Sequence, residues 1–288
     1  MSLIPNIPKD HNFWGGVESS LKLSNLDSAV EKFRSITGAT DLDSINDLAL
    51  LLNGKGLKNE YSLTSFLPNQ NYGTGSKAAQ IGSLTNDEWT LLNGLPWSPN
   101  GLSFNGINQC AEIENFLGGK NKRIYRFHRI HEISEGFFPT IWGAGDDYEL
   151  NDYYYSGTTS GSIRYAVYES YLSNNVGIAN GNSYFHQAGD VYISMSPHEY
   201  IVGEQFIDKV SYLYPNDDIG AATDNFTIPT DYYTSSDYSF PITLGCSYEN
   251  GVAAYFAEIV ISATLVIETA KALTTEELKE IRTALKAL

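Results

Sequence analysis

The fold is decided by the stretch Asp190-Val191-Tyr192-Ile193-Ser194-Met195-Ser196, in which apolar and polar side chains alternate without a break. A period of two places Val191, Ile193 and Met195 on one face of an extended strand, where they can pack against a core. Further runs of this type are residues 162–172, 209–214 and 254–261. Turn-rich pieces such as Tyr155-Ser156-Gly157 and Ala179-Asn180-Gly181-Asn182 separate these runs. Many short strands separated by such turns predict a mainly β sandwich rather than βαβ units.

Two regions precede the predicted sandwich, which we expect to span residues 61–288. Residues 1–23 are predicted to form an extended arm, because Pro5 and Pro8 block a helix. Its apolar anchors are Phe13 and Trp14, and we expect a partner protein or a sister subunit to hold them. Residues 24–60 carry apolar side chains at helical spacing in two short segments, which predicts a helical hairpin.

The end of the chain carries a complete helix signal. Thr274 is the expected N-cap, and Glu277 three residues later closes a capping box, which predicts a helix over residues 274–287. The apolar side chains that follow share one face, which we expect to pack on the sandwich: Leu278, Ile281, Leu285 and Leu288.

Charge is concentrated in the middle of the chain. The 288 residues carry a net charge of −16, and residues 146–258 hold 16 acidic side chains against only Arg164 and Lys209. Such a surface repels phosphate backbones, so nucleic-acid binding is not expected. The same block contains 17 of the 20 tyrosines. Tyrosine suits surfaces that contact sugars or proteins, and it is also a good strand residue.

Neither export nor membrane insertion is expected. Met1 to Asp10 lacks a basic region followed by an apolar run, so no secretory signal is visible. The longest apolar run, residues 252–267, is interrupted by Glu258 and is too short to cross a bilayer. Two cysteines do not make a disulfide framework, and we predict that Cys110 and Cys246 are free thiols in a reducing compartment. A disulfide would require their two predicted strands to be adjacent.

Three short motifs resemble one family. The segment Gly101-Leu102-Ser103-Phe104-Asn105-Gly106-Ile107-Asn108 is similar to the opening strand of concanavalin A-like, laminin-G-like jelly rolls. Pro241-Ile242-Thr243-Leu244-Gly245 is similar to a later strand of that family, and residues 255–261 and 271–278 are similar to its ending. The helical hairpin ahead of such a sandwich also resembles structural proteins of tailed bacteriophages. The resemblance implies a concanavalin A-like sandwich on a virion.

Catalytic and metal-binding patterns are weak. Glycosidases of this family carry a three-carboxylate strand motif, whereas Glu112 and Glu114 make only a pair, so no catalytic residue is assigned. One predicted loop contains the acidic residues Asp146, Asp147 and Glu149, which could ligate Ca²⁺ or simply be solvated. No other cofactor or metal is expected. His128 and His131 are three apart on a predicted strand and therefore point to opposite faces.

Residues 120–133 are predicted to form a basic strand beside the acidic block. Its arginines are candidates for docking an acidic neighbour, including another copy of the chain: Arg123, Arg126 and Arg129. An edge strand protected from aggregation by positive charge is the equal alternative.

The resemblance and the tyrosine clusters lead to one functional expectation. Sugar-binding jelly rolls stack aromatic side chains on sugar rings at a concave face or loop rim, and two loop-like clusters here combine aromatics with carboxylates. The candidate glycan-binding residues are Asp152, Tyr153, Tyr154, Tyr155, Asp231, Tyr232 and Tyr233. We therefore expect a non-enzymatic, oligomeric bacteriophage virion protein that decorates head or tail and adheres to surface glycans. The alternatives are a polysaccharide hydrolase of the same fold, a cellular carbohydrate-binding module, and tyrosines that pack against a neighbouring subunit.

Overall fold

The structure is a computed structural model. It describes residues 26–116, 123–133, 137–144, 150–159, 162–173, 176–185, 190–197, 209–211, 224–226, 241–249, 251–271 and 273–288. Within these residues the chain is a β-sandwich of the jelly-roll type, with antiparallel sheets and three helices. No helix in the described residues is long and apolar enough to cross a membrane.

One sheet, called sheet A here, has the strand order β13-β8-β19-β1-β3, with β6 paired to β19 and β5 paired to β6. Its strands are β1 (Tyr61–Ser65), β3 (Ile81–Gly82), β5 (Trp97–Ser98), β6 (Gly101–Ser103), β8 (Arg123–Ile133), β13 (Asp190–Pro197) and β19 (Ile259–Thr269). The alternating stretch that predicted a strand is β13, and its backbone pairs antiparallel with β8.

The opposing sheet, sheet B, has the order β12-β11-β10-β9-β16-β7-β4-β2. Its strands are β2 (Lys77–Ala78), β4 (Trp89–Leu92), β7 (Cys110–Ile113), β9 (Phe137–Ala144), β10 (Leu150–Thr159), β11 (Ser162–Ser173), β12 (Val176–Phe185) and β16 (Ile242–Leu244). Two short hairpins complete the strands: β14 (Lys209–Ser211) with β15 (Asp224–Phe226), and β17 (Ser247–Glu249) with β18 (Val252–Ala254).

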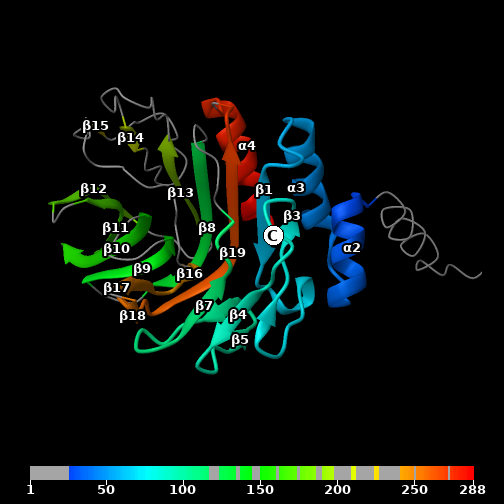
Figure 1. The fold of residues 1–288 in the computed structure, drawn as a ribbon, viewed down its shortest axis with the longest axis horizontal. Helices are drawn as coiled ribbons and strands as arrows, with labels where there is room; N and C mark the ends of the chain where they lie inside the picture. Colours follow the sequence, from blue (N-terminus) through cyan, green and yellow to red (C-terminus); the bar gives the residue numbers. More distant parts are fainter. Residues whose placement is uncertain are drawn as a thin grey trace, which may run out of the picture.

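The helices cover one face of sheet A, and sheet B covers the other (Figure 1). They are α2 (Ser28–Thr37), α3 (Asp43–Gly54) and α4 (Thr275–Lys286), with a 3₁₀ turn at Pro68–Gln70. The predicted hairpin segments are thus helical, and α2 ends at Gly38, which takes a left-handed conformation. Apolar side chains of all three helices share one hydrophobic cluster with Tyr61, Phe127 and Leu265 of sheet A.

Strand β19 lies at the centre of the molecule. Leu265 and Ile267 contact the helix-side cluster, whereas Ile261 and Val266 belong to the cluster between the sheets. Every residue of β19 is buried. A strand covered on both faces favours a nearly continuous apolar sequence, which explains the long apolar run.

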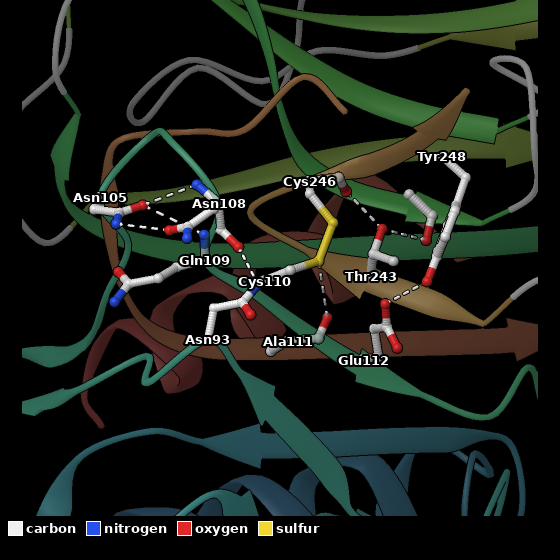
Figure 2. Close-up of a disulfide and its surroundings, with 11 residues drawn as sticks. Asn93, Asn105, Asn108, Gln109, Cys110, Ala111, Glu112, Thr243, Cys246 and Tyr248 are labelled. Atoms are coloured by element: carbon white, nitrogen blue, oxygen red, sulfur yellow. Dashed lines mark hydrogen bonds between the residues drawn. A yellow bond between two sulfur atoms is a disulfide. The ribbon is translucent and has the colours of Figure 1, made fainter. Parts of the chain in front are cut away.

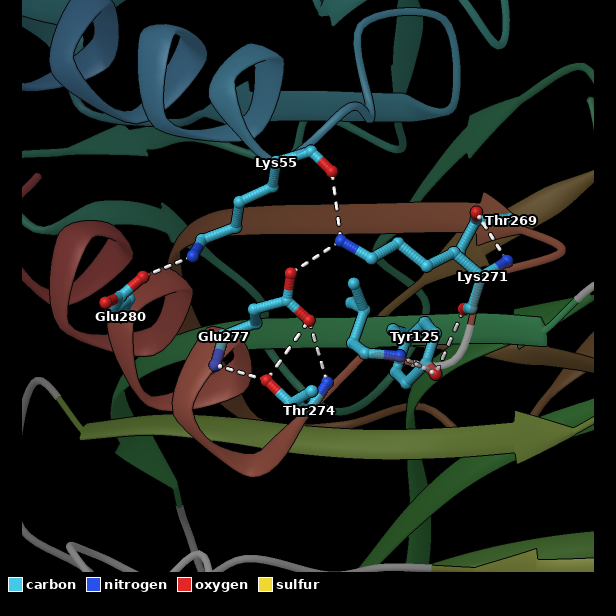
Figure 3. A network of polar contacts seen from close by, with 8 residues as sticks. Lys55, Tyr125, Thr269, Lys271, Thr274, Glu277 and Glu280 are labelled. Atoms are coloured by element: carbon cyan, nitrogen blue, oxygen red, sulfur yellow. Dashed lines mark hydrogen bonds and ion pairs between the residues drawn. The ribbon is translucent and has the colours of Figure 1, made fainter.

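The C-terminal helix begins as its sequence predicts. Thr274 Oγ1 accepts from the Glu277 backbone N–H at 3.2 Å, and the Glu277 carboxylate accepts from the Thr274 backbone N–H at 2.9 Å. Figure 3 shows that Lys271 extends this cap: its Nζ donates to Glu277 Oε1 at 2.5 Å and to the Lys55 carbonyl at 3.0 Å. Lys55 in turn pairs with Glu280 of α4. The predicted apolar face of this helix is buried in the helix-side cluster.

Three local predictions were wrong. Tyr155-Ser156-Gly157 and residues 179–182 were expected as turns but lie inside β10 and β12, because backbone pairing with the neighbouring strand β11 continues through both segments. The expected strand over residues 254–261 is interrupted: β18 ends at Ala254, β19 begins at Ile259, and Tyr255 has a φ of 52°.

Candidate functional site

Three connections meet beside the ends of β6, β7 and β19. They are residues 93–94 after β4, residues 104–109 between β6 and β7, and residues 255–258 before β19; together we call them the rim. The Gly106 backbone N–H donates to the Ala257 carbonyl at 3.1 Å, which joins the second and third connections. Asn93 Nδ2 donates to the Asn108 carbonyl at 2.6 Å, and Gln109 Nε2 donates to the Gly94 carbonyl at 3.3 Å. These hydrogen bonds tie all three connections into one surface.

Asn105 organises the middle connection. Its Oδ1 accepts from the backbone N–H groups of Ile107, Asn108 and Gln109 at 3.0, 3.2 and 3.3 Å. Its Nδ2 donates to Asn108 Oδ1 at 3.0 Å. Asparagine favours turns because its side chain can take the place of a backbone acceptor in this way. The loop is therefore held in one shape by its own side chain.

The rim leaves polar atoms available to a ligand. Within the described part of the chain, Asn93 Oδ1, Asn108 Nδ2 and Gln109 Oε1 make no hydrogen bond, although the other half of each amide is engaged. Asn93 and Asn108 are exposed. Ile107, next to Asn108 in the chain, presents an apolar side chain that is 74% exposed. The surface offers fixed donors and acceptors around an apolar patch.

Tyr255 is the unusual residue of the third connection. Its φ of 52° is left-handed, a conformation that bulky side chains rarely adopt. The Ala257 backbone N–H donates to the Gly245 carbonyl at 2.8 Å, which fixes the segment just after it. Strained backbone of this kind persists where surrounding structure holds it, often at binding sites. Tyr255 and Phe256 are both half-buried and are the aromatic residues of the third connection.

A disulfide lies directly under the rim (Figure 2) and corrects the prediction of free thiols. Cys110 follows the last amide of the rim, and its Cα lies 5.6 Å from that of Cys246. The two strands are adjacent, since Leu244 of β16 pairs with Ala111 of β7. Gly245, with a φ of 75°, turns the chain toward Cys110, and the Phe104 ring would collide with any Cβ there. Sequence alone did not show that these strands are neighbours.

Beside the disulfide, Glu112 is engaged by an aromatic side chain. The Tyr248 hydroxyl, on β17, donates to the Glu112 carboxylate. Burial, together with this hydrogen bond, raises the pKa of Tyr248. The Thr243 hydroxyl donates to the Cys246 carbonyl at 2.6 Å and so holds the backbone of the disulfide cysteine. Glu114, the second carboxylate of the predicted pair, is exposed.

The tyrosine clusters predicted to bind glycans are only partly described. Asp152 to Tyr155 were expected in a loop but lie on β10, where the register places Asp152 opposite Glu169 and Tyr153 opposite Tyr168 of β11. Sequence reasoning did not pair these residues, because the pairing depends on the hairpin register. The remaining predicted positions lie outside the described residues: Asp231, Tyr232, Tyr233, Phe13, Trp14, Asp146, Asp147 and Glu149.

The basic strand is β8, and it is not an edge strand. It lies between β13 and β19, so charge on it does not protect a sheet edge. Arg126, expected to dock a partner, is fully buried, with its guanidinium 5.0 Å from the centre of the Trp142 ring. It pairs with Val266, whose side chain faces the space between the sheets, and it therefore points inward. Arg129 is half-buried, and burial lowers its pKa. Arg123 is the first residue of β8.

The two histidines of β8 do not share a site. His128 is buried, and its Nδ1 lies 3.0 Å from the Thr264 hydroxyl, whereas His131 is half-buried three positions along the strand. Among the described residues, no group of three or more metal-ligating side chains could hold an ion. The rim itself was missed as a site, although its two Asn-Gly pairs at residues 93–94 and 105–106 were visible turn signals.

The comparisons with known proteins add neighbours of low similarity. No family model and no curated protein matches the chain. The carbohydrate-binding module CBM40 of the Ruminococcus gnavus IT-sialidase, bound to α2,3-sialyllactose, is 12% identical over 56% of this chain and 82% of that one, with a TM-score of 0.34. A mutant Trypanosoma rangeli sialidase with trans-sialidase activity is 13% identical, with a TM-score of 0.44.

The alignment with the Trypanosoma rangeli sialidase covers 84% of this chain but 38% of that protein. The NanB sialidase of Streptococcus pneumoniae is 13% identical over 62% of this chain and 26% of its own, with a TM-score of 0.36. The chain thus spans well under half of the sialidases that it resembles. No residue role passes from these proteins to the rim.

Proposed function

We propose that the chain is a non-enzymatic carbohydrate-binding protein displayed in many copies on a bacteriophage virion. The observation that carries the sugar-binding part is the rim, which combines three amides that each keep one free polar atom with the exposed Ile107 and with Tyr255 of the hydrogen-bonded third connection. Sugars present hydroxyl pairs that donate and accept together, and C–H faces that pack on apolar or aromatic side chains. Amides held by their own hydrogen bonds lose little freedom when they bind such a ligand.

Display on a virion is supported by the resemblance of the hairpin and sandwich to tailed-phage structural proteins. One rim offers two or three hydrogen bonds and a small stacking surface, which corresponds to a millimolar constant, about −4 kcal/mol. Display in many copies raises the avidity by about 10²–10⁴ without any new contact.

The test is a glycan array probed with the full-length chain in its assembled form. Asn108→Ala removes the free amide donor, and Tyr255→Asn removes the aromatic ring while keeping a residue that tolerates the left-handed backbone. Each change should weaken binding by about tenfold, the effect of one lost hydrogen bond or stacking contact. The matched control is Asn59→Ala, an exposed amide ahead of β1 that should leave binding unchanged.

Three outcomes would each contradict a part of the proposal. Binding that survives both rim variants but disappears in Tyr154→Ala would move the site to β10. Release of reducing sugar from any bound glycan would contradict the non-enzymatic part. For the virion part, antibody raised against the chain should label phage particles in negative-stain images, and unlabelled particles would argue against it.

A further inference from the structure

A pocket lies away from the rim, between α2 and the segment from β2 to β4. Its volume is about 380 Å³, and it is lined by residues of α2, β2, β3 and the loop before β4. In Figure 1, α2 lies on the opposite side of the sandwich from β17 and β18, beside which the rim is built. Ligand pockets for small molecules begin at about 300 Å³, so this one accommodates a molecule of monosaccharide size.

The floor of the pocket is apolar and rigid. Phe33, Ala79 and Ile81 are almost fully buried and belong to the helix-side cluster. Ile36 forms part of the wall and is 51% exposed, so it offers an apolar surface to a ligand in the pocket. A ring with one apolar face could cover it.

The loop opposite α2 is fixed by its own hydrogen bonds. Thr85 Oγ1 donates to Asp87 Oδ2 at 2.8 Å and accepts from the Asp87 backbone N–H at 3.0 Å. The Gln80 amide donates to the Thr85 carbonyl. The polar groups of this wall therefore hold their positions without a ligand.

Glu88 is held from the inner side. The Tyr72 hydroxyl donates to its carboxylate. Burial, with this hydrogen bond, raises the pKa of Tyr72 to about 12, so the hydroxyl keeps its proton and remains a donor at neutral pH. The Tyr72 hydroxyl occupies Glu88 Oε1, and the other carboxylate oxygen, Oε2, makes no hydrogen bond among the described residues and can accept one from a ligand hydroxyl.

Two ammonium groups flank the pocket, and among the described residues neither donates a hydrogen bond to a carboxylate, although Lys77 forms a loose ion pair with Glu88. Lys32 Nζ lies 3.5 Å from Asn86 Oδ1, at the outer limit of a hydrogen bond. Lys77 Nζ lies 3.9 Å from Glu88 Oε2, beyond hydrogen-bond reach. Both side chains are exposed and come from different elements, α2 and β2. A ligand carboxylate between them would receive the charge-assisted hydrogen bonds that the protein itself leaves unmade.

We propose that this pocket binds a small hydroxylated carboxylate of monosaccharide size, with its carboxylate held by Lys32 and Lys77 and its hydroxyls by Glu88 and Asp87. This site is separate from the rim and does not depend on it. Uronic acids are the simplest ligands of this class, because they join one carboxylate to a ring of hydroxyls.

Calorimetric titration of the full chain with glucuronate tests the proposal, with methyl glucoside as the neutral ligand of the same ring size. Glucuronate should bind saturably, and methyl glucoside at least about tenfold more weakly, because it lacks the charged hydrogen bonds. Lys77→Gln should weaken glucuronate binding by about tenfold. Glu88→Gln should also weaken it, because the one amide oxygen stays with the Tyr72 hydroxyl and leaves no acceptor for the ligand hydroxyls.

The matched control is Lys58→Gln, an exposed lysine outside the pocket, which should change neither affinity. Circular dichroism of each variant verifies the fold. Equal affinities for the two sugars, no saturable binding, or the same loss in Lys58→Gln and Lys77→Gln would each overturn the proposal. The rim variant Asn108→Ala should retain glucuronate binding, so failure at one site is distinguishable from failure at the other.

Discussion

Strands β8 and β19 of sheet A present two faces that differ in chemistry. On the helix side, Tyr125, Phe127 and Leu265 meet the apolar faces of α2, α3 and α4. On the sandwich side, the same two strands contribute Arg126, His128 and Thr264, all buried beside apolar neighbours such as Trp142. The helix face gains stability from apolar burial, which is non-directional and tolerant. The inner face depends on buried polar groups that each require a partner.

The largest expected effect is on the helix face. Phe127→Ala should lower the free energy of unfolding by about 3–5 kcal/mol, because it removes a fully buried ring and leaves a cavity among α4 and the sheet. Urea denaturation measures the loss. Phe127→Leu keeps most of the volume and should cost less than half as much; equal losses would mean that packing does not govern this face.

A smaller effect is expected on the inner face. Thr264→Val keeps the shape of the side chain but removes the hydroxyl that contacts His128 Nδ1 at 3.0 Å. A buried polar atom that loses its partner costs about 1–3 kcal/mol, again measured by urea denaturation. The control Thr264→Ser retains the hydroxyl. If Val proves as stable as Thr, the inner face does not depend on this hydrogen bond.

The cap of α4 tests how firmly the helix layer is attached. Thr274→Ala should lower the free energy of unfolding by about 1 kcal/mol, because it removes the acceptor for the Glu277 N–H. Thr283→Ala is the matched control on the exposed side of the same helix, and its effect should stay within about 0.5 kcal/mol. Thermal unfolding of the two variants side by side gives the comparison.

The smallest effect concerns pH. The Lys271 ammonium, followed by the Thr274 backbone N–H, holds the pKa of Glu277 below its ordinary value of 4.5. A carboxyl whose pKa is lower when folded contributes stability above its ordinary pKa, and this stability is lost as pH falls through the folded pKa. Glu277→Gln should therefore flatten the acid side of the stability profile. Unchanged acid sensitivity in this variant would assign the effect to other carboxylates.

Sequence predicts the local features of this molecule and misses the ones set by distant neighbours. The cap at Thr274 and Glu277 depends on residues three apart, so it is visible in the sequence. The Cys110–Cys246 bond joins residues 136 positions apart and depends on β7 and β16 being neighbours. Arg126 was expected on a surface, because no local pattern shows that β8 lies inside sheet A. The rim likewise combines three segments that only the folded chain brings together.

The Cys110–Cys246 bond also closes a covalent ring, and this ring contains most of the acidic, tyrosine-rich block that starts at residue 146. A protease that cuts once inside the ring cannot release a fragment, because both pieces remain joined through sulfur. The nicked protein should therefore migrate as one band without reductant and as two bands with it. A chain that has lost one peptide bond inside the ring therefore keeps its two pieces covalently joined.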